Sequence, residues 1–201
     1  EQPEYNGTQL IHSKVIASYL RQLLRNDLQY APFRMEGMEQ DVKEMMEIDT
    51  PQGKLTLQIG GTIDRLDSKG DTLRIVDYKT GGSPKTPENI EQLFTPADNR
   101  PNYIFQTFLY AAILCRKQSL KVAPSLLYIH RAASESYSPV IEMGAPRQPK
   151  VPVSNFAFFE DEFRERLHGL LQEIFSPEET FSQTEDTRKC EYCDYRSLCK
   201  R

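Results

Sequence analysis

Two neighbouring stretches decide the fold: GGTIDRLD at residues 60–67 and RIVDYKTG at residues 74–81. Apolar side chains alternate with polar ones through residues 54–67 and again through residues 72–79, which is the pattern of two half-buried strands. Residues 68–71 (SKGD) have the composition of a turn, and a four-residue loop would pair Asp67 with Thr72. We therefore predict a β-hairpin with that register.

This register places two acidic side chains on one face of the hairpin. Asp64 would lie opposite Ile75, and Asp77 would be its diagonal neighbour, with roughly 7–8 Å between the two backbones. Lys79 follows on the same face as Asp77, because side chains alternate along a strand. Two short carboxylates at that separation can bind one hard cation, with the lysine beside it. The arrangement predicts a metal site.

Two adjacent glycines support the same prediction. Gly60 and Gly61 would lie across from Asp77 and Tyr78, where the missing side chains leave room for a metal and a phosphate. The simpler alternative is a surface hairpin with scattered charges. That alternative does not explain why two acids and a lysine share an otherwise apolar face.

Length and composition bound the class of protein. The chain has 201 residues, 38% of them hydrophobic and 27% charged, which predicts one soluble domain with a full core. No apolar run could span a bilayer and no signal peptide opens the chain, so we expect a cytoplasmic protein with no membrane contact. The net charge of −4 excludes a uniformly basic nucleic-acid binder but leaves room for a local basic patch. The first residue is Glu1, and we expect a piece of a longer protein with its N-terminal part truncated.

The residues around the hairpin predict helices on both sides of a sheet. Thr8 should cap a helix reaching about Asn26, with Ile11, Val15 and Leu20 among its inward residues. Further patterns predict a strand over 33–49, a long exposed loop over 81–101, a buried helix over 102–117, strands over 121–130 and 136–142, and a helix capped by Ser154. This order predicts an α/β fold with an αβββαβ core, in which helices flank one mixed sheet.

Four residues outside the hairpin are weaker candidates for the site. Gln106 and Tyr110 are four apart on the buried helix, so they share a face and need polar partners, although a satisfied core pair is an equal alternative. Glu39 could supply a third carboxylate, although most such glutamates are simply solvated. His12 is more typical of a surface or core residue than of a ligand.

The C-terminal tail has a chemistry of its own. Cys190, Cys193 and Cys199 form C-x2-C-x5-C, in which the first pair has the spacing of a metal chelate, although a fourth thiolate is missing. Cys115, earlier in the chain, is typical of a small buried hydrophobe. Residues 188–201 carry five basic and two acidic residues with two interleaved tyrosines, a composition that suits nucleic acid. An ordinary terminal turn with free thiols is the alternative. We expect residues 1–180 to form one domain, with 181–201 packed on it.

Three motifs in this order resemble one known family. They are G-x-x-D-R-x-D at 61–67, D-Y-K-T-G at 77–81 and Q-x-x-x-Y at 106–110. Together they resemble the RecB-like branch of the PD-(D/E)XK nucleases, and the cysteine tail resembles the iron–sulfur staple of the AddB helicase–nuclease subunit. The resemblance implies a restriction-endonuclease-like fold. It also implies a metal-dependent DNA nuclease of repair or recombination, with a helicase module in the same chain or in a partner subunit.

The resemblance also implies roles for individual residues. Asp64, Asp77 and the backbone carbonyl of Tyr78 would bind Mg²⁺ or Mn²⁺, with Glu39 as a weaker candidate ligand. Lys79 would orient the attacking water and stabilise the phosphate. The remaining roles fall to Gln106 and Tyr110 lining the site, to Arg65, Arg196 and Lys200 on DNA, and to Cys190, Cys193 and Cys199 as ligands of iron–sulfur or zinc.

Two departures from the family accompany these roles. His12 lacks the sequence context of the family's early histidine, so we expect its counterpart upstream. The family's first cluster cysteine also has no counterpart here except Cys115, which is a poor match in the Gln–Tyr helix, so a [4Fe-4S] cluster would need a residue of the longer protein.

Two other classes of function stay open at this point. One is a catalytically silent DNA-binding scaffold that keeps the nuclease fold, and the other is a small zinc-binding interaction domain built on the tail. The sequence does not separate endonuclease from exonuclease action, nor single-stranded from double-stranded substrates.

Overall fold

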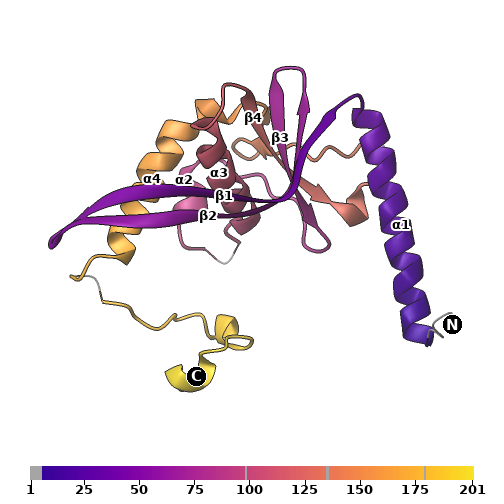
Figure 1. Cartoon of the computed structure of the whole chain (residues 1–201). Coiled ribbons are helices and arrows are strands. Elements are labelled where there is room, and N and C mark those ends of the chain that lie inside the picture. Colours follow the sequence, from indigo (N-terminus) through magenta and orange to yellow (C-terminus); the bar gives the residue numbers. More distant parts are fainter. Residues whose placement is uncertain (1–5, 98, 135, 179) are drawn as a thin grey trace.

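A four-stranded mixed sheet forms the centre of the molecule (Figure 1). The computed structural model describes residues 6–97, 99–134, 136–178 and 180–201. The strands run in the order β1-β2-β3-β4, the first two pairings antiparallel and the last parallel. Their bounds are β1 Arg34–Thr50, β2 Gly53–Lys69, β3 Thr72–Lys79 and β4 Lys121–Tyr128.

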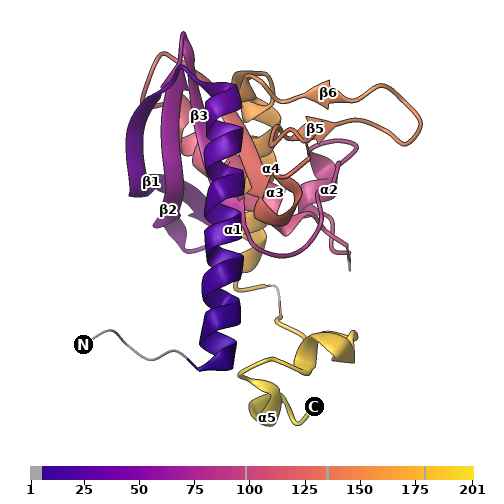
Figure 2. The ribbon, with the colours of Figure 1, turned by 90° about the vertical axis from the view of Figure 1, so that its right-hand side faces the viewer.

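Helices cover both faces of this sheet. Figures 1 and 2 show α1 (Gly7–Tyr30) on one face and α2 (Glu91–Phe94), α3 (Asn102–Cys115) and α4 (Glu160–Ile174) on the other. The smaller elements are η1 Ile129–Arg131, β5 Glu142–Met143, β6 Val151–Pro152, η2 Phe156–Phe158, η3 Thr187–Cys190 and α5 Arg196–Cys199. The predicted αβββαβ order with a mixed sheet is confirmed.

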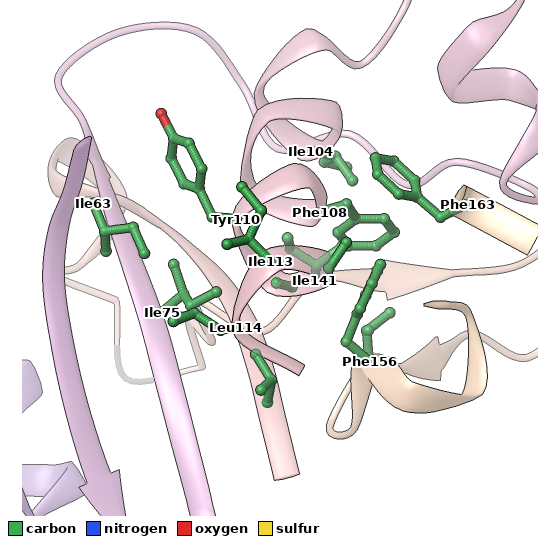
Figure 3. Close-up of a cluster of buried hydrophobic side chains, with 14 of the residues drawn as sticks. Ile63, Ile75, Ile104, Phe108, Tyr110, Ile113, Leu114, Ile141, Phe156 and Phe163 are labelled. Carbon is green, nitrogen blue, oxygen red and sulfur yellow. The ribbon is translucent and has the colours of Figure 1, made fainter. Parts of the chain in front are cut away.

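The main core lies between the sheet and α3 (Figure 3). Helix α3 is apolar nearly all round, and its Phe108 packs edge-on against Phe156 with 4.9 Å between the ring centroids. Phe163 of α4 joins the same aromatic group, while Ile75 enters it from β3. Complete burial of such side chains contributes about 1.5–3 kcal/mol each. This core holds α3 against the sheet, where it packs most extensively on β4.

The register of the central hairpin differs from the predicted one. Lys69 pairs with Thr72 and Asp67 pairs with Arg74, so the loop consists of two residues instead of four. Gly70 adopts a φ of 62°, which a tight hairpin loop needs and which glycine adopts without strain. Because the strands stay paired up to that loop, the predicted pairing of Asp67 with Thr72 is wrong. The last pair of the ladder is Arg65 with Val76.

Helix α1 buries only part of its predicted apolar side, which includes Tyr19 and Leu23. Asn6, and not Thr8, caps it by accepting a hydrogen bond from the backbone N–H of Gln9. The helix has 24 residues and is about 36 Å long. Its N-terminal half extends beyond the sheet (Figures 1 and 2). Apolar side chains expected to face inward are therefore exposed, among them Ile11, Val15, Leu20 and Leu24. Tyr19 and Leu23 do pack against the sheet.

A buried ionic network attaches the C-terminal end of α1 to the sheet. Asp67 is completely buried and accepts hydrogen bonds from Arg65 Nε at 2.8 Å and from Arg74 Nε at 2.9 Å. Arg65 also reaches Asp27 of α1 at 2.8 Å and the hydroxyl of Tyr78 at 3.0 Å. Buried charges are tolerated only when they are paired in this way. The network therefore determines where α1 can lie.

Two predictions after β3 also need correction. Residues 81–101 are not an exposed loop throughout, because they contain α2 and bury Ile90 and Leu93. Residues 136–142 do not form a full partner strand to β4. The hydroxyl of Tyr137 accepts a hydrogen bond from Tyr128 N and donates one to Leu126 O, so a side chain satisfies the backbone groups that a strand would have paired.

The last helix begins later than predicted. Asn155, instead of Ser154, caps the short η2 turn, and α4 starts at Glu160. The helical spacing of apolar residues after Ser154 predicts that Phe163, Leu167 and Ile174 face inward; Phe163 and Leu167 do, whereas Ile174 is 40% exposed.

Candidate active site

Asp64 and Asp77 lie where β2 and β3 separate. Arg65 is the last β2 residue paired with β3, and its partner is Val76. Extending this register by one residue places Asp64 directly opposite Asp77, instead of in the predicted diagonal position. The Oδ2 atom of Asp64 accepts a hydrogen bond from the backbone N–H of Tyr78 at 2.8 Å. The Asp64 carboxylate thus accepts the hydrogen bond that a backbone carbonyl of β2 would accept if the β2–β3 ladder continued. This bond holds Asp64 against the backbone that also carries Asp77.

Asp77 and Lys79 form a close ion pair. Lys79 Nζ lies 2.6 Å from Asp77 Oδ2, and Asp77 is only 5% exposed. Apart from this ion pair, no hydrogen-bond donor among the described residues reaches this buried carboxylate oxygen. Burial raises the pKa of Asp77 above its ordinary value, the Lys79 ammonium opposes that rise, and the Asp64 carboxylate adds to it. Burial therefore disfavours the ionised form of Asp77 in spite of the ammonium beside it.

Helix α3 contributes the other side chains of the site. Gln106 Oε1 lies 3.5 Å from Lys79 Nζ, and Gln106 Nε2 donates a hydrogen bond to Tyr110 Oη at 3.0 Å. In Figure 3 the hydroxyl of Tyr110 points away from Phe108. The ring of Tyr103 lies beneath the lysine, with 4.2 Å between Nζ and the ring centroid. The lysine is thus held by a carboxylate, an amide and an aromatic face.

The two glycines serve a different purpose from the predicted one. Gly60 and Gly61 pair with β1, opposite Lys43 and Val42, and not with β3. A Cβ added at Gly61 would lie 2.6 Å from Tyr110 Oη, so the missing side chain makes room for the tyrosine and not for a metal or a phosphate.

We expect Gly61→Ala to lower the DNA cleavage that the sequence resemblance implies by about 10- to 100-fold, because the added methyl group must displace the Tyr110 ring and with it Gln106 and Lys79. Steady-state cleavage rates measure this effect. Gly169→Ala is the control, since a Cβ there meets nothing within 4 Å. Equal cleavage by both variants would show that the position of Tyr110 does not matter.

Several sequence-predicted residues lie outside this group. Glu39 neighbours Asp64 across β1 and β2, but its backbone is left-handed (φ 47°) and its side chain is exposed. Within the described residues no three His, Cys, Asp or Glu side chains gather as a metal site, so Glu39 does not join the two aspartates. His12 lies exposed in the N-terminal half of α1. Arg65 is 3% exposed and ion-paired, so its predicted DNA contact is wrong.

The cysteines are likewise apart from any described metal group. Cys190, Cys193 and Cys199 lie in a tail whose side chains are largely exposed and whose hydrogen bonds include Gln183 Nε2 to Cys199 O. Cys115 is half-buried in α3, and burial raises the pKa of its thiol to about 11, which suits a packing role. The described residues therefore do not support the expected iron–sulfur or zinc ligand set. Arg196 and Lys200 are exposed in the same tail.

Tyr103 is the one contributor that the sequence argument missed. It lies three residues before Gln106 and seven before Tyr110, which is the spacing of one helical face. This spacing could have identified Tyr103 as a site residue, but an aromatic residue in an apolar helix is ordinarily assigned to the core. Here the ring is 45% exposed and contacts the lysine.

Comparison with known proteins identifies the family. The family model of the PD-(D/E)XK nuclease superfamily matches residues 1–200. The chain belongs to this superfamily. No curated protein matches the chain significantly. Within the described residues no helix is both long and apolar enough to cross a membrane.

The residues of this PD-(D/E)XK site fit the divalent metal that the superfamily typically uses. Asp77 offers a buried oxygen whose described partner is Lys79, Asp64 keeps one carboxylate oxygen beyond the one bound to Tyr78 N, and the Tyr78 carbonyl directly follows Asp77 in the chain. Oxygen ligands of this kind suit hard cations. The raised pKa of Asp77 points the same way, since a cation would supply the missing positive charge.

Proposed function

We propose that this chain is a metal-dependent deoxyribonuclease of the RecB-like branch. The observation that carries the proposal is the meeting of Asp64, Asp77 and Lys79 at the point where β2 and β3 separate, with Gln106 beside the lysine. Two acids and one lysine in a partly buried site are the groups that phosphodiester hydrolysis requires. A scaffold without catalysis has no need of a buried Asp77 whose described partner is Lys79 alone.

The mechanism assigns a task to each side chain. Asp64, Asp77 and the Tyr78 carbonyl would hold Mg²⁺ or Mn²⁺, which when bound supplies positive charge to the phosphate and makes water a better nucleophile. The ammonium of Lys79 has three N–H donors, and Asp77 and Gln106 occupy two directions around it. The remaining N–H would serve a phosphate oxygen or the attacking water, with the Tyr103 ring beneath the ammonium. Gln106 positions the lysine, and Tyr110 positions Gln106.

Two surface features bear on the partner module and on the DNA contacts that we propose. The exposed apolar residues of α1, among them Ile11 and Leu24, form the kind of surface that another protein module covers. The resemblance to helicase–nucleases makes a helicase module, in the same chain or in a partner subunit, our proposed occupant of that surface. Arg196 and Lys200 in the basic tail would contact the DNA backbone.

Cleavage of end-labelled DNA tests the proposal. We expect cutting with Mg²⁺ or Mn²⁺, none after chelation by EDTA, and recovery when the metal is restored. Asp77→Asn, purified in parallel, controls for contaminating nuclease, and the exposed Asp71→Asn controls for the loss of a charge. Cutting that survives EDTA, or that is equal in Asp77→Asn, would contradict the proposal. Binding without cutting in every preparation would favour the scaffold.

A further inference from the structure

A pocket of about 280 Å³ adjoins the candidate site. It lies between the loop that follows β3 and the N-terminal end of α3, and Tyr128 of β4 lines it as well. Tyr103 belongs to both places, because it lines the pocket while its ring lies beneath Lys79. Tyr128 is the β4 residue paired with Lys79. The pocket is therefore next to the bond that would be cut.

Two aromatic rings line this pocket. Tyr103 is 45% exposed, whereas Tyr128 is 2% exposed and fixed in the sheet. Gly82 closes the loop over them with a φ of 79°, and a Cβ placed there would lie 3.6 Å from the Tyr103 ring and 3.9 Å from Tyr128. Glycine adopts that backbone conformation without strain, which lets the loop pass close to both rings. A flat group could stack on the exposed part of Tyr103.

The charge around the pocket is positive. Lys85 Nζ donates to the backbone carbonyls of Asn99 and Arg100, and Arg100 Nε donates to the side-chain amide of Asn102. All these partners are neutral, and among the described residues no Asp or Glu lines the pocket. Two cations and no acid among the described residues that line the pocket favour an anion there, while Glu88 and Glu91 line a separate hollow on the other side of Arg100. The pocket thus combines an aromatic face with a phosphate-attracting rim.

We propose that this pocket binds one unpaired nucleotide beside the scissile phosphate. Its base stacks on Tyr103, and its phosphate lies near Lys85 and Arg100. A base inside a duplex is stacked and paired on both sides, so only a single strand or a frayed end can place a base there. The volume is small for a ligand pocket, which suits one nucleoside. The inference rests on the proposed nuclease function and names its substrate class as single-stranded DNA.

Binding without cleavage tests the pocket directly. Fluorescence anisotropy in EDTA, with a labelled oligothymidylate and with a duplex of equal length, needs no hydrolysis. We expect Tyr103→Leu to weaken single-strand binding about tenfold, since stacking on one aromatic ring contributes that much. Tyr103→Phe keeps the ring and should keep the affinity. Arg100→Gln should weaken binding and lower the salt dependence by about one charge. Phe158→Leu and Arg147→Gln are the matched exposed controls.

A cleavage arm locates the nucleotide relative to the cut. An oligonucleotide with a single abasic position next to the cleaved bond should be cut about tenfold more slowly by wild type, with no further loss in Tyr103→Leu. Additive losses would overturn the stacking contact. Unchanged single-strand affinity in Tyr103→Leu, or an equal loss on duplex, would overturn the pocket even if the enzyme cuts DNA. If the protein cuts nothing, the binding arm still decides the inference, so the two proposals fail separately.

Discussion

Replacing Lys79 by methionine is expected to lower the kcat for DNA cleavage by about 10²- to 10³-fold, which is the usual cost of one preorganised donor to a transition state. Methionine keeps an unbranched stem over the Tyr103 ring but lacks the charge that lies 2.6 Å from Asp77. Single-turnover cleavage at saturating metal measures the effect. Metal affinity should survive in this variant, whereas Asp77→Asn should lose it.

The pH dependence separates the lysine's two roles. Lys79 lowers the pKa of Asp77 against the effect of burial, so its removal raises that pKa further. Asp77 must be ionised to bind a cation, and a raised pKa means that more of it is protonated at a given pH. The acid limb of the residual activity should therefore move to higher pH. Lys54→Met, at the far end of the β1–β2 hairpin, is the control. An unshifted limb would place the lysine away from Asp77 in solution.

Asp67→Asn is expected to reduce the free energy of unfolding by about 3–5 kcal/mol, the range measured when one partner of a buried ionic group is removed. Two guanidinium groups lose their shared carboxylate, and Arg65 and Arg74 are 3% and 5% exposed. For a chain of 201 residues this corresponds to a fall in Tm of roughly 6–20 °C. Urea unfolding followed by circular dichroism gives the value.

The matched control for this stability effect is Asp71→Asn. Asp71 pairs with Lys121 at 2.7 Å, but both side chains are more than half exposed, and such pairs contribute less than about 1 kcal/mol. If both variants lost the same stability, the network around Asp67 would not be what attaches α1. A second readout is protease cutting within α1, which should speed up in Asp67→Asn only.

The sequence predicted secondary structure best in the segments where apolar residues follow a single pattern. The alternation of residues 54–67 and 72–79 and the apolar run of 102–115 predicted two strands and a buried helix, because burial on one or all sides leaves a strong pattern. The order of the acidic, lysine and glutamine motifs predicted a common site. Their exact partners needed the fold. The two-residue loop at Gly70 moved Asp64 from a diagonal position to one opposite Asp77.

Other features could not be predicted from local patterns. The apolar stripe of α1 has helical spacing, but only a structure shows that the helix extends beyond the sheet and leaves Leu20 and Leu24 exposed. The use of Tyr137 as a substitute for a strand depends on a single hydroxyl reaching two backbone groups. Arg65 is a charged residue in a nuclease motif, so a contact with DNA was predicted. Its ion pair with Asp67, two residues away, instead keeps it buried. In each case a tertiary contact outweighed the local signal.

The hydrogen bond from Tyr78 N to Asp64 has a consequence for how divergent relatives should be interpreted. Asp64 terminates the β2–β3 ladder, so a descendant that had lost catalysis would still gain from keeping this aspartate. Asp77 and Lys79 have no comparable duty, since a buried ion pair can be exchanged for apolar residues at little cost or even with a gain in stability. Retention of the first acid alone therefore carries little information about activity. Joint retention of Asp77 and Lys79 marks a lineage under selection for chemistry.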